Sequence, residues 1–135
     1  MITADSSVWI DYFGGRVTPA TGQLDVVLDD SSQDVVLLDV VLMEVLRGFR
    51  FDREWKVARD AFAAMPILTA GGETVAMKAA SLYRMLRSGG STIRSSIDLL
   101  VGTWCIENDC GLIHSDRDFT PMVNHGLQVW SHEGA

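Results

Sequence analysis

The chain has few of the features that mark secreted, zinc-binding or membrane-spanning proteins. It contains two cysteines in 135 residues, Cys105 and Cys110, and their spacing of five matches neither a CxxC redox pair nor a zinc-ligand pattern. Two reduced thiols in the core are therefore favoured over a disulfide. The longest apolar runs, VVLLDVVLMEVL and IDLLVGTWCI, are interrupted by acids and fall short of the roughly 20 residues that a membrane helix needs. The opening MITADSSVWI lacks the basic leader and apolar segment of a secretion signal, so we expect a soluble, cytoplasmic protein.

Positive charge is also scarce, and it is confined to one part of the chain. There are 11 Lys and Arg against 18 Asp and Glu, for a net charge of −7. Residues 1–46 carry −7, residues 47–94 carry +5 and residues 95–135 carry −5. The basic middle can meet a polyanion such as a nucleic acid. The alternative is that its Arg and Lys side chains only solvate helix faces.

Short apolar segments alternate with segments of helical periodicity along the whole chain. Strands are predicted at residues 1–5, 35–39, 66–69, 111–114 and 127–131. Helices are predicted at residues 6–13, 20–30, 40–49, 53–65, 72–88 and 95–109, with a short one starting at 118. Because strands and helices alternate without a linker or repeat, we expect a single α/β domain over residues 1–135. Its sheet should be mainly parallel, with about five strands.

One helix combines a predicted core face with an acid on a different face. The positions of residues 40–49 that have core spacing are Val40, Met43, Leu46 and Phe49. Glu44 points away from these positions, so its carboxylate can reach the ends of the strands. An unpaired carboxylate in so apolar a helix would be costly, and a partner is therefore required.

Four acids stand where a predicted strand gives way to a loop or helix, or on the adjoining helix. They are Asp5, Glu44, Asp98 and Asp116. Parallel sheets place their working groups at the carboxyl ends of strands. Carboxylates gathered there repel one another unless cations neutralise them. The pattern therefore predicts a site for a divalent metal ion.

Each acid also has a structural explanation when taken alone. Asp5 can cap the helix that follows it, and Asp116 or Asp118 can cap the helix that begins DFTPM. Glu44 can pair with Arg47, and Asp98 lies in a first helical turn, where the helix dipole favours an acid. All four acids are expected on one edge of one sheet, and that shared location favours the metal site over four unrelated explanations.

The segments DSSVWIDYF, VVLMEVLRGF and TIRSSIDLLVGTWCIENDCGLIHSDRDF resemble PIN-domain ribonucleases of the VapC toxin type. The resemblance runs along the whole chain, and the last segment is the most specific. It implies a three-layer α/β/α fold, a Mg²⁺ or Mn²⁺ cofactor and endonucleolytic cleavage of RNA. It also implies inhibition by a cognate VapB-type antitoxin, a toxin homodimer and a higher toxin–antitoxin assembly.

The same resemblance assigns roles to individual residues. Asp5, Glu44, Asp98 and Asp116 correspond to the acidic quartet of the family. Asp118 corresponds to an additional acid that is present in some members. Ser6 or Ser7, and Ser115, match polar positions beside the quartet. Ser7 and Ser115 are better placed to orient carboxylates than to attack the phosphorus as nucleophiles.

Chemistry at such a site follows from its carboxylates. Asp5, Asp98 and Asp116 would hold the metal and Asp118 would add a ligand, while Glu44 would bind a second ion or accept a proton. Water would be the nucleophile, and the sequence leaves open whether one or two ions act. None of the three histidines, His114, His125 and His132, is assigned to catalysis.

RNA is expected to contact the basic middle of the chain. The predicted contacts are Arg47, Arg50 and Arg53, together with Lys56 and Arg59, and Arg84, Arg87 and Arg94 are further candidates. The target is left open between transfer, ribosomal and messenger RNA. The alternative to a nuclease is a non-catalytic α/β binding module whose acids hold a structural ion.

Overall fold

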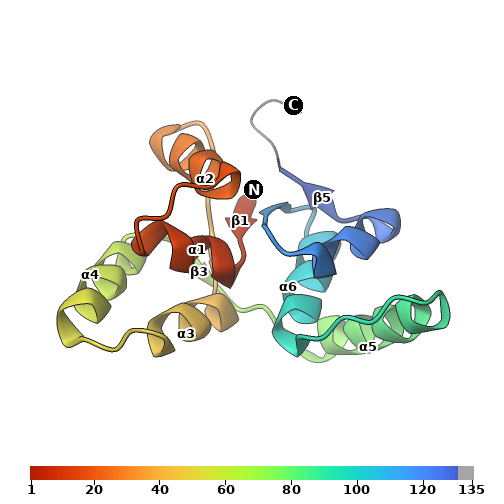
Figure 1. The fold of residues 1–135 in the computed structure, drawn as a ribbon. Helices are drawn as coiled ribbons and strands as arrows, with labels where there is room; N and C mark the ends of the chain where they lie inside the picture. The colour runs from red at the N-terminus through yellow and green to blue at the C-terminus, as the bar shows by residue number, and fades with distance from the viewer. Residues whose placement is uncertain (131–135) are drawn as a thin grey trace.

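A computed structural model describes residues 1–130 and contains every predicted strand and helix (Figure 1). The strands are β1 (Ile2–Ala4), β2 (Leu37–Leu38), β3 (Ile67–Leu68), β4 (Gly111–Ile113) and β5 (Gln128–Val129). The helices are α1 (Ser6–Phe13), α2 (Pro19–Asp29), α3 (Asp39–Arg47), α4 (Asp52–Ala63), α5 (Glu73–Ser88), α6 (Ser96–Glu107) and the 3₁₀ helix η1 (Arg117–His125). Ser131, where the last strand was predicted to end, lies outside the described residues, as does His132.

All strand pairs within residues 1–130 are parallel. β1 pairs with β4 and β4 with β5, while β2 pairs with β3 in a second short ladder. An isolated parallel bridge between Ile2 and Val35 joins the two ladders. Across that bridge the spatial order is β3-β2-β1-β4-β5. The predicted parallel arrangement of about five strands is confirmed, although it is divided into two sheets that only the isolated Ile2–Val35 bridge connects within residues 1–130.

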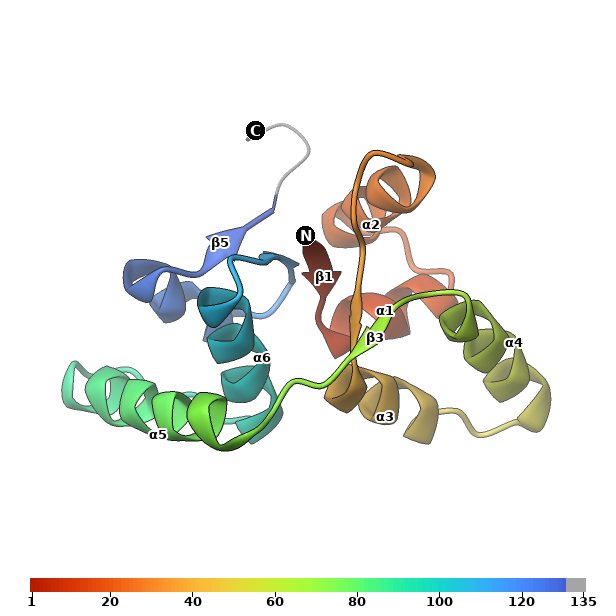
Figure 2. The ribbon, with the colours of Figure 1, turned by 180° about the vertical axis from the view of Figure 1, so that it is seen from behind.

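Helices lie on both sides of the strands. In Figures 1 and 2, which show opposite faces, α1 to α4 lie on one side of β1, and α5, α6 and η1 lie on the other. Aromatic rings hold α1 against α4: Phe62 meets Trp9 edge-on at 5.1 Å and Phe13 at 5.3 Å between ring centroids. Cys105 and Cys110 are free and buried, as expected for core thiols. None of the helices within residues 1–130 is both long enough and apolar enough to cross a membrane.

The predicted core face of α3 is wrong in part. The structure buries Val41 and Val45 completely or nearly so, while Met43 is 47% exposed. Six of the nine residues in DVVLMEVLR are apolar and they are distributed around the helix, so periodicity alone could not distinguish the two faces. The contacts of α3 with α1 and α4 decide which face is buried.

A glycine lets α6 approach η1 more closely than any other residue would. A Cβ atom placed on Gly102 would lie 2.1 Å from the Sδ atom of Met122 and 3.6 Å from the ring of Phe119. Both of these side chains are fully buried, so neither can swing into solvent. Gly102 therefore sets the distance between the helix that carries Asp98 and the segment that follows Asp116.

We predict that Gly102→Ala lowers the free energy of unfolding by about 1–3 kcal/mol, because the methyl group overpacks the contact with Met122. Gly22→Ala is the matched control, since Gly22 lies in α2 and a methyl group added there would meet no atom within 4 Å. The control should be neutral or stabilising by up to about 1 kcal/mol. Urea unfolding of both variants measures the difference, and equal stability would contradict the close approach.

Candidate active site

The site begins where the order of the strands reverses direction along the chain. From β1 the chain goes to β2 and β3 on one side, and later to β4 and β5 on the other. Asp5 directly follows β1, and its backbone N–H donates to Ile113 O, at the end of β4, over 3.1 Å. Asp116 lies three residues beyond that point. Crevices at such reversals, outside the carboxyl ends of the strands, are where α/β folds bind ligands.

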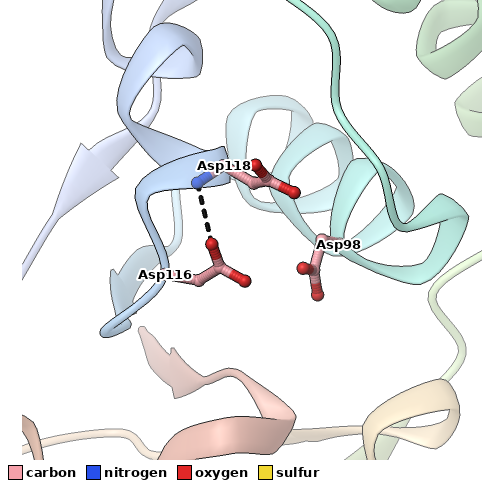
Figure 3. A group of neighbouring side chains, drawn as sticks. All are labelled: Asp98, Asp116 and Asp118. Carbon is pink, nitrogen blue, oxygen red and sulfur yellow. Dashed lines mark hydrogen bonds between the residues drawn. The ribbon is translucent and has the colours of Figure 1, made fainter.

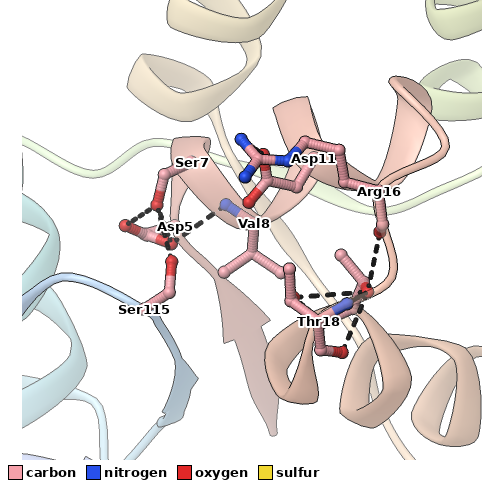
Figure 4. A network of polar contacts seen from close by, with 8 residues as sticks. Asp5, Ser7, Val8, Asp11, Arg16, Thr18 and Ser115 are labelled. Atoms are coloured by element: carbon pink, nitrogen blue, oxygen red, sulfur yellow. Dashed lines mark hydrogen bonds and ion pairs between the residues drawn. The ribbon is translucent and has the colours of Figure 1, made fainter.

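Asp5 is buried, with 2% of its surface exposed, and is held by the start of α1. Its carboxylate accepts hydrogen bonds from Ser7 Oγ, at 3.0 and 3.2 Å to the two oxygens, and from the Val8 N–H at 3.4 Å. Ser7 Oγ also lies 3.3 Å from Ser115 Oγ, which reaches the site from the loop after β4 (Figure 4). Asp5 is therefore the N-cap of α1 and also lines the site, so its explanation as a helix cap is compatible with its explanation as a metal ligand.

Glu44 reaches the site from α3. Ser6 Oγ donates a hydrogen bond to one carboxylate oxygen of Glu44 at 2.5 Å, and the Arg47 guanidinium lies 3.8 Å from the other. The required partner of this acid is thus Arg47, as expected, with Ser6 as a second one. Of the two serines considered at the start of α1, Ser6 contacts Glu44 and Ser7 contacts Asp5.

Asp98, Asp116 and Asp118 point toward one another (Figure 3). One carboxylate oxygen of each lies within 4.8 Å of the other two. Two backbone N–H groups fix the group: Asp118 N–H donates to Asp116 Oδ1 at 2.9 Å, and Arg94 N–H donates to Asp118 Oδ2 at 3.3 Å. At the start of α6, Ser95 Oγ accepts from the Asp98 N–H at 3.2 Å, which orients the first turn of that helix.

A cavity of about 230 Å³ collects the four predicted acids. Its lining comprises Asp5, Ser6, Ser7, Ile10, Glu44, Arg47, Ser95, Asp98 and Asp116. Among these described residues, Arg47 is the only cation. We refer to this hollow as the acidic cavity.

Two acids of this cavity, Asp5 and Asp98, lie in surroundings that disfavour their charged forms. The pKa of Asp5 is raised to about 7. Burial is the main cause, the hydrogen bond from Ser7 opposes it, and the carboxylates of Asp98 and Asp116 contribute to the rise. Burial also raises the pKa of Asp98 to about 6, and Asp116 and Glu44 add to the effect. A donor set made only of oxygen atoms, with charge that is costly without a cation, fits Mg²⁺ or Mn²⁺.

Residues 2–122 match the family model of the PIN domain. The chain belongs to the PIN-domain family. Ribonuclease VapC11 of Mycobacterium tuberculosis strain H37Rv is 27% identical over 119 residues, which cover 88% of this chain and 89% of that protein. VapC ribonuclease Mb1587 of Mycobacterium bovis gives the same identity and coverage.

Solved structures show the same PIN fold. VapBC2 from Rickettsia felis, bound to a DNA fragment from its promoter, matches with a TM-score of 0.75 at 17% identity, covering 97% of this chain and 100% of that chain. FitAcB from Neisseria gonorrhoeae matches with a TM-score of 0.71 at 15% identity, covering 97% of both chains. At these identities the likeness concerns the fold alone, and it confirms the predicted three-layer PIN-like architecture.

The predicted basic contacts of this PIN domain do not form one patch around the acids. Arg47 lines the acidic cavity, whereas Arg53 lines a different, apolar groove. Arg50 lies over the ring of Phe51, and Arg59 stacks on Trp55 while pairing with Asp60 at 3.0 Å. Their role in RNA binding stays a prediction, with Arg47 the member that reaches the cavity.

His114 packs beside the site without lining its cavity. Its ring centroid lies 5.0 Å from that of Phe119, and burial lowers its pKa. Sequence reasoning missed Ser95 and Ile10 as cavity residues. Ser95 is the N-cap of α6, a position that local sequence explains without a site, and Ile10 lies on the exposed side of α1, which no apolar periodicity identifies.

We predict that, in EDTA, Asp98→Asn becomes more stable relative to the parent as the pH rises. The folded-state pKa of Asp98 is about 6, against an ordinary value of 3.8. Between these values the folded parent keeps a proton that the unfolded chain has released, so the parent loses stability as the pH rises through this window. The amide side chain of Asp98→Asn carries no charge, so the variant does not lose stability in this way. Because Asp98 is only half-buried, the effect on Tm should be a few degrees.

Thermal unfolding of both proteins in EDTA from pH 4 to pH 8 tests this expectation. Addition of Mg²⁺ or Mn²⁺ at pH 8 should raise the Tm of the parent more than that of Asp98→Asn, because a cation neutralises the repelling carboxylates. A Tm difference that does not change with pH would show that the carboxylate of Asp98 is not destabilised in the folded state.

Proposed function

We propose that this PIN domain is a metal-dependent endoribonuclease toxin of the VapC type. The observation that carries the proposal is the convergence of Asp5, Glu44, Asp98 and Asp116 on one cavity. The names of the mycobacterial relatives, VapC ribonuclease and Ribonuclease VapC11, support RNA as the substrate class. A transfer RNA is one candidate target, beside ribosomal and messenger RNA.

The residues that would hold the metal are Asp98, Asp116 and Asp118, together with Asp5 and Glu44 at the other wall. When bound, Mg²⁺ or Mn²⁺ supplies Lewis-acid stabilisation for the phosphate charge and for an attacking water. The contribution of the chain itself is to hold the carboxylates in place through hydrogen bonds. Ser7 and the Val8 N–H hold Asp5, and the Asp118 N–H holds Asp116.

Glu44 is the candidate proton carrier. The carboxylate of Glu44 is oriented by Ser6 and Arg47, so it can accept a proton from water or hold a second ion. Asp5, whose pKa is about 7 before any cation binds, would have to release its proton in order to hold a metal. In this scheme Ser7 orients the carboxylate of Asp5, and Ser115 contacts the hydroxyl of Ser7. A covalent intermediate is not expected.

The nuclease assay uses the purified chain, free of antitoxin, and total RNA. With Mg²⁺ or Mn²⁺ we expect discrete new RNA ends, and we expect EDTA or Asp98→Asn to reduce cleavage by at least about 100-fold, as loss of a group that acts in the transition state does. Asp29→Asn is the matched control, because Asp29 is exposed on α2 and does not line the acidic cavity. Sequencing of the new ends would identify the target.

The alternative, a non-catalytic module with a structural ion, predicts a different pattern. RNA would remain uncut by folded, metal-loaded protein, and Asp98→Asn would lower the Tm in the presence of metal without changing RNA integrity. Cleavage that persists in both EDTA and Asp98→Asn would point to a contaminating nuclease.

The proposed inhibitor is a VapB-type antitoxin, and an apolar groove beside the active site supports a place for it. This groove has a volume of about 470 Å³ and lies between α1, α3 and α4. Ile10 lines both the groove and the acidic cavity, so a segment in the groove would end at the active site. An amphipathic helix fits such a groove through its apolar face. A toxin homodimer and a higher toxin–antitoxin assembly complete the proposal.

We predict that Val57→Glu weakens binding of the cognate antitoxin by about tenfold or more, because a carboxylate would have to be buried in the apolar groove. Val57 is 62% exposed in the free chain, so the substitution should leave the Tm unchanged. Val26→Glu on α2, which contributes no residue to the groove, is the matched control. Calorimetric titration of both variants with antitoxin measures the effect, and equal affinities would exclude this groove.

A further inference from the structure

A second hollow adjoins the active site, between the end of α5, the loop of residues 89–95 and η1. Its volume is about 570 Å³. Its polar lining includes Arg94, Arg117, Asp118, Asn124 and His125. We call this hollow the arginine cleft. None of the described residues that line it is Phe, Tyr or Trp, so it offers hydrogen-bond donors and positive charge rather than a stacking surface for bases.

The two arginines of the cleft are free to meet a ligand. Both are exposed, and neither takes part in the ion pairs found within residues 1–130. In contrast, Arg47 and Arg59 each have a carboxylate partner. Guanidinium groups match the geometry of phosphate oxygens. In a chain with a net charge of −7, two such unpaired groups in one hollow favour an anionic ligand.

The cleft is joined to the active site through shared backbone. Asp118 lines the cleft and also belongs to the group formed with Asp98 and Asp116. The Arg94 N–H binds Asp118 Oδ2, and the next residue, Ser95, lines the acidic cavity. A ligand that occupies both hollows therefore passes over Asp118. Only an extended polyanion can place one phosphate at the acids and the next ones at the arginines.

On the basis of the proposed ribonuclease function, we propose that the arginine cleft binds the sugar–phosphate backbone of the RNA strand next to the scissile bond. Arg94 and Arg117 contact phosphate oxygens, and Asn124 and His125 supply hydrogen bonds to the sugar–phosphate backbone. The cleft thus positions the strand. The sequence-based prediction placed the main RNA contacts at Arg47, Arg50 and Arg53, and Arg117 was not among the candidates.

The test compares the parent with Arg94→Ala, Arg117→Ala and the double variant. Both substitutions keep the backbone N–H groups that orient Asp118 and Asp116, so the acids stay in place. Arg16→Ala is the matched control: Arg16 is exposed beyond the other end of α1 from Asp5, and its loss removes one positive charge, as each single substitution in the cleft does. The probe is a short, fluorescently labelled single-stranded RNA of mixed sequence, titrated in Mg²⁺ on an Asp98→Asn background to prevent cleavage.

We expect the double variant to bind this RNA about tenfold or more weakly than the Arg16→Ala control. The slope of log affinity against log salt should fall by about 1.4, because each phosphate contact with a single strand contributes about 0.7. In proteins that retain Asp98, KM for RNA should rise while kcat changes little. Arg117→Lys should restore part of the affinity, since it keeps the charge.

Equal affinity and equal salt slope in the double variant and the Arg16→Ala control would overturn the assignment of the cleft. A double variant that loses affinity for a poly-glutamate peptide but not for RNA would also overturn it, and would assign the cleft to an acidic protein partner. If the parent cuts no RNA with either metal, the proposed ribonuclease function itself fails. If the parent cuts RNA and the double variant cuts it equally well, only the assignment of the cleft fails.

Discussion

The parallel pairing of β1 with β4 is the constraint on which the rest of the site depends. It brings residues more than a hundred positions apart to one edge, with Asp5 N–H bonded to Ile113 O. Since β2 and β3 extend the strand order in the opposite direction, a crevice remains outside these two strand ends. Asp5 and Asp116 enter it from the strands, and α3 and α6 bring Glu44 and Asp98.

Helix caps and the candidate metal site use the same carboxylates. Asp5 caps α1 and Asp116 caps η1, so the hydrogen bonds of the two caps hold these acids at the acidic cavity. Burial is the main cause of the raised pKa values of Asp5 and Asp98, and repulsion from neighbouring carboxylates adds to it. A cation bound at the proposed metal site would therefore also stabilise the folded chain.

The surroundings of the acidic cavity divide into surfaces of different chemistry. The groove between α1, α3 and α4 is apolar and shares Ile10 with the cavity, whereas the arginine cleft is polar and shares the backbone around Asp118 with it. An apolar partner segment and an RNA strand would thus approach the acids from different elements. Under the proposed function, this division would let a chain with an overall acidic charge present a local basic surface to RNA.

The sequence by itself determined the strands and helices, the parallel α/β class and the four acids, because apolar runs, caps and acids at strand ends are local signals. It also predicted the Glu44–Arg47 pair, which lies within one helix. Only the tertiary structure decided which face of α3 is buried, that Ser6 serves Glu44 while Ser7 serves Asp5, and that Arg94 and Arg117 share a cleft. Those contacts join segments far apart along the chain. They form when the helices pack on the parallel strands, and no local sequence pattern predicts which segments that packing brings together.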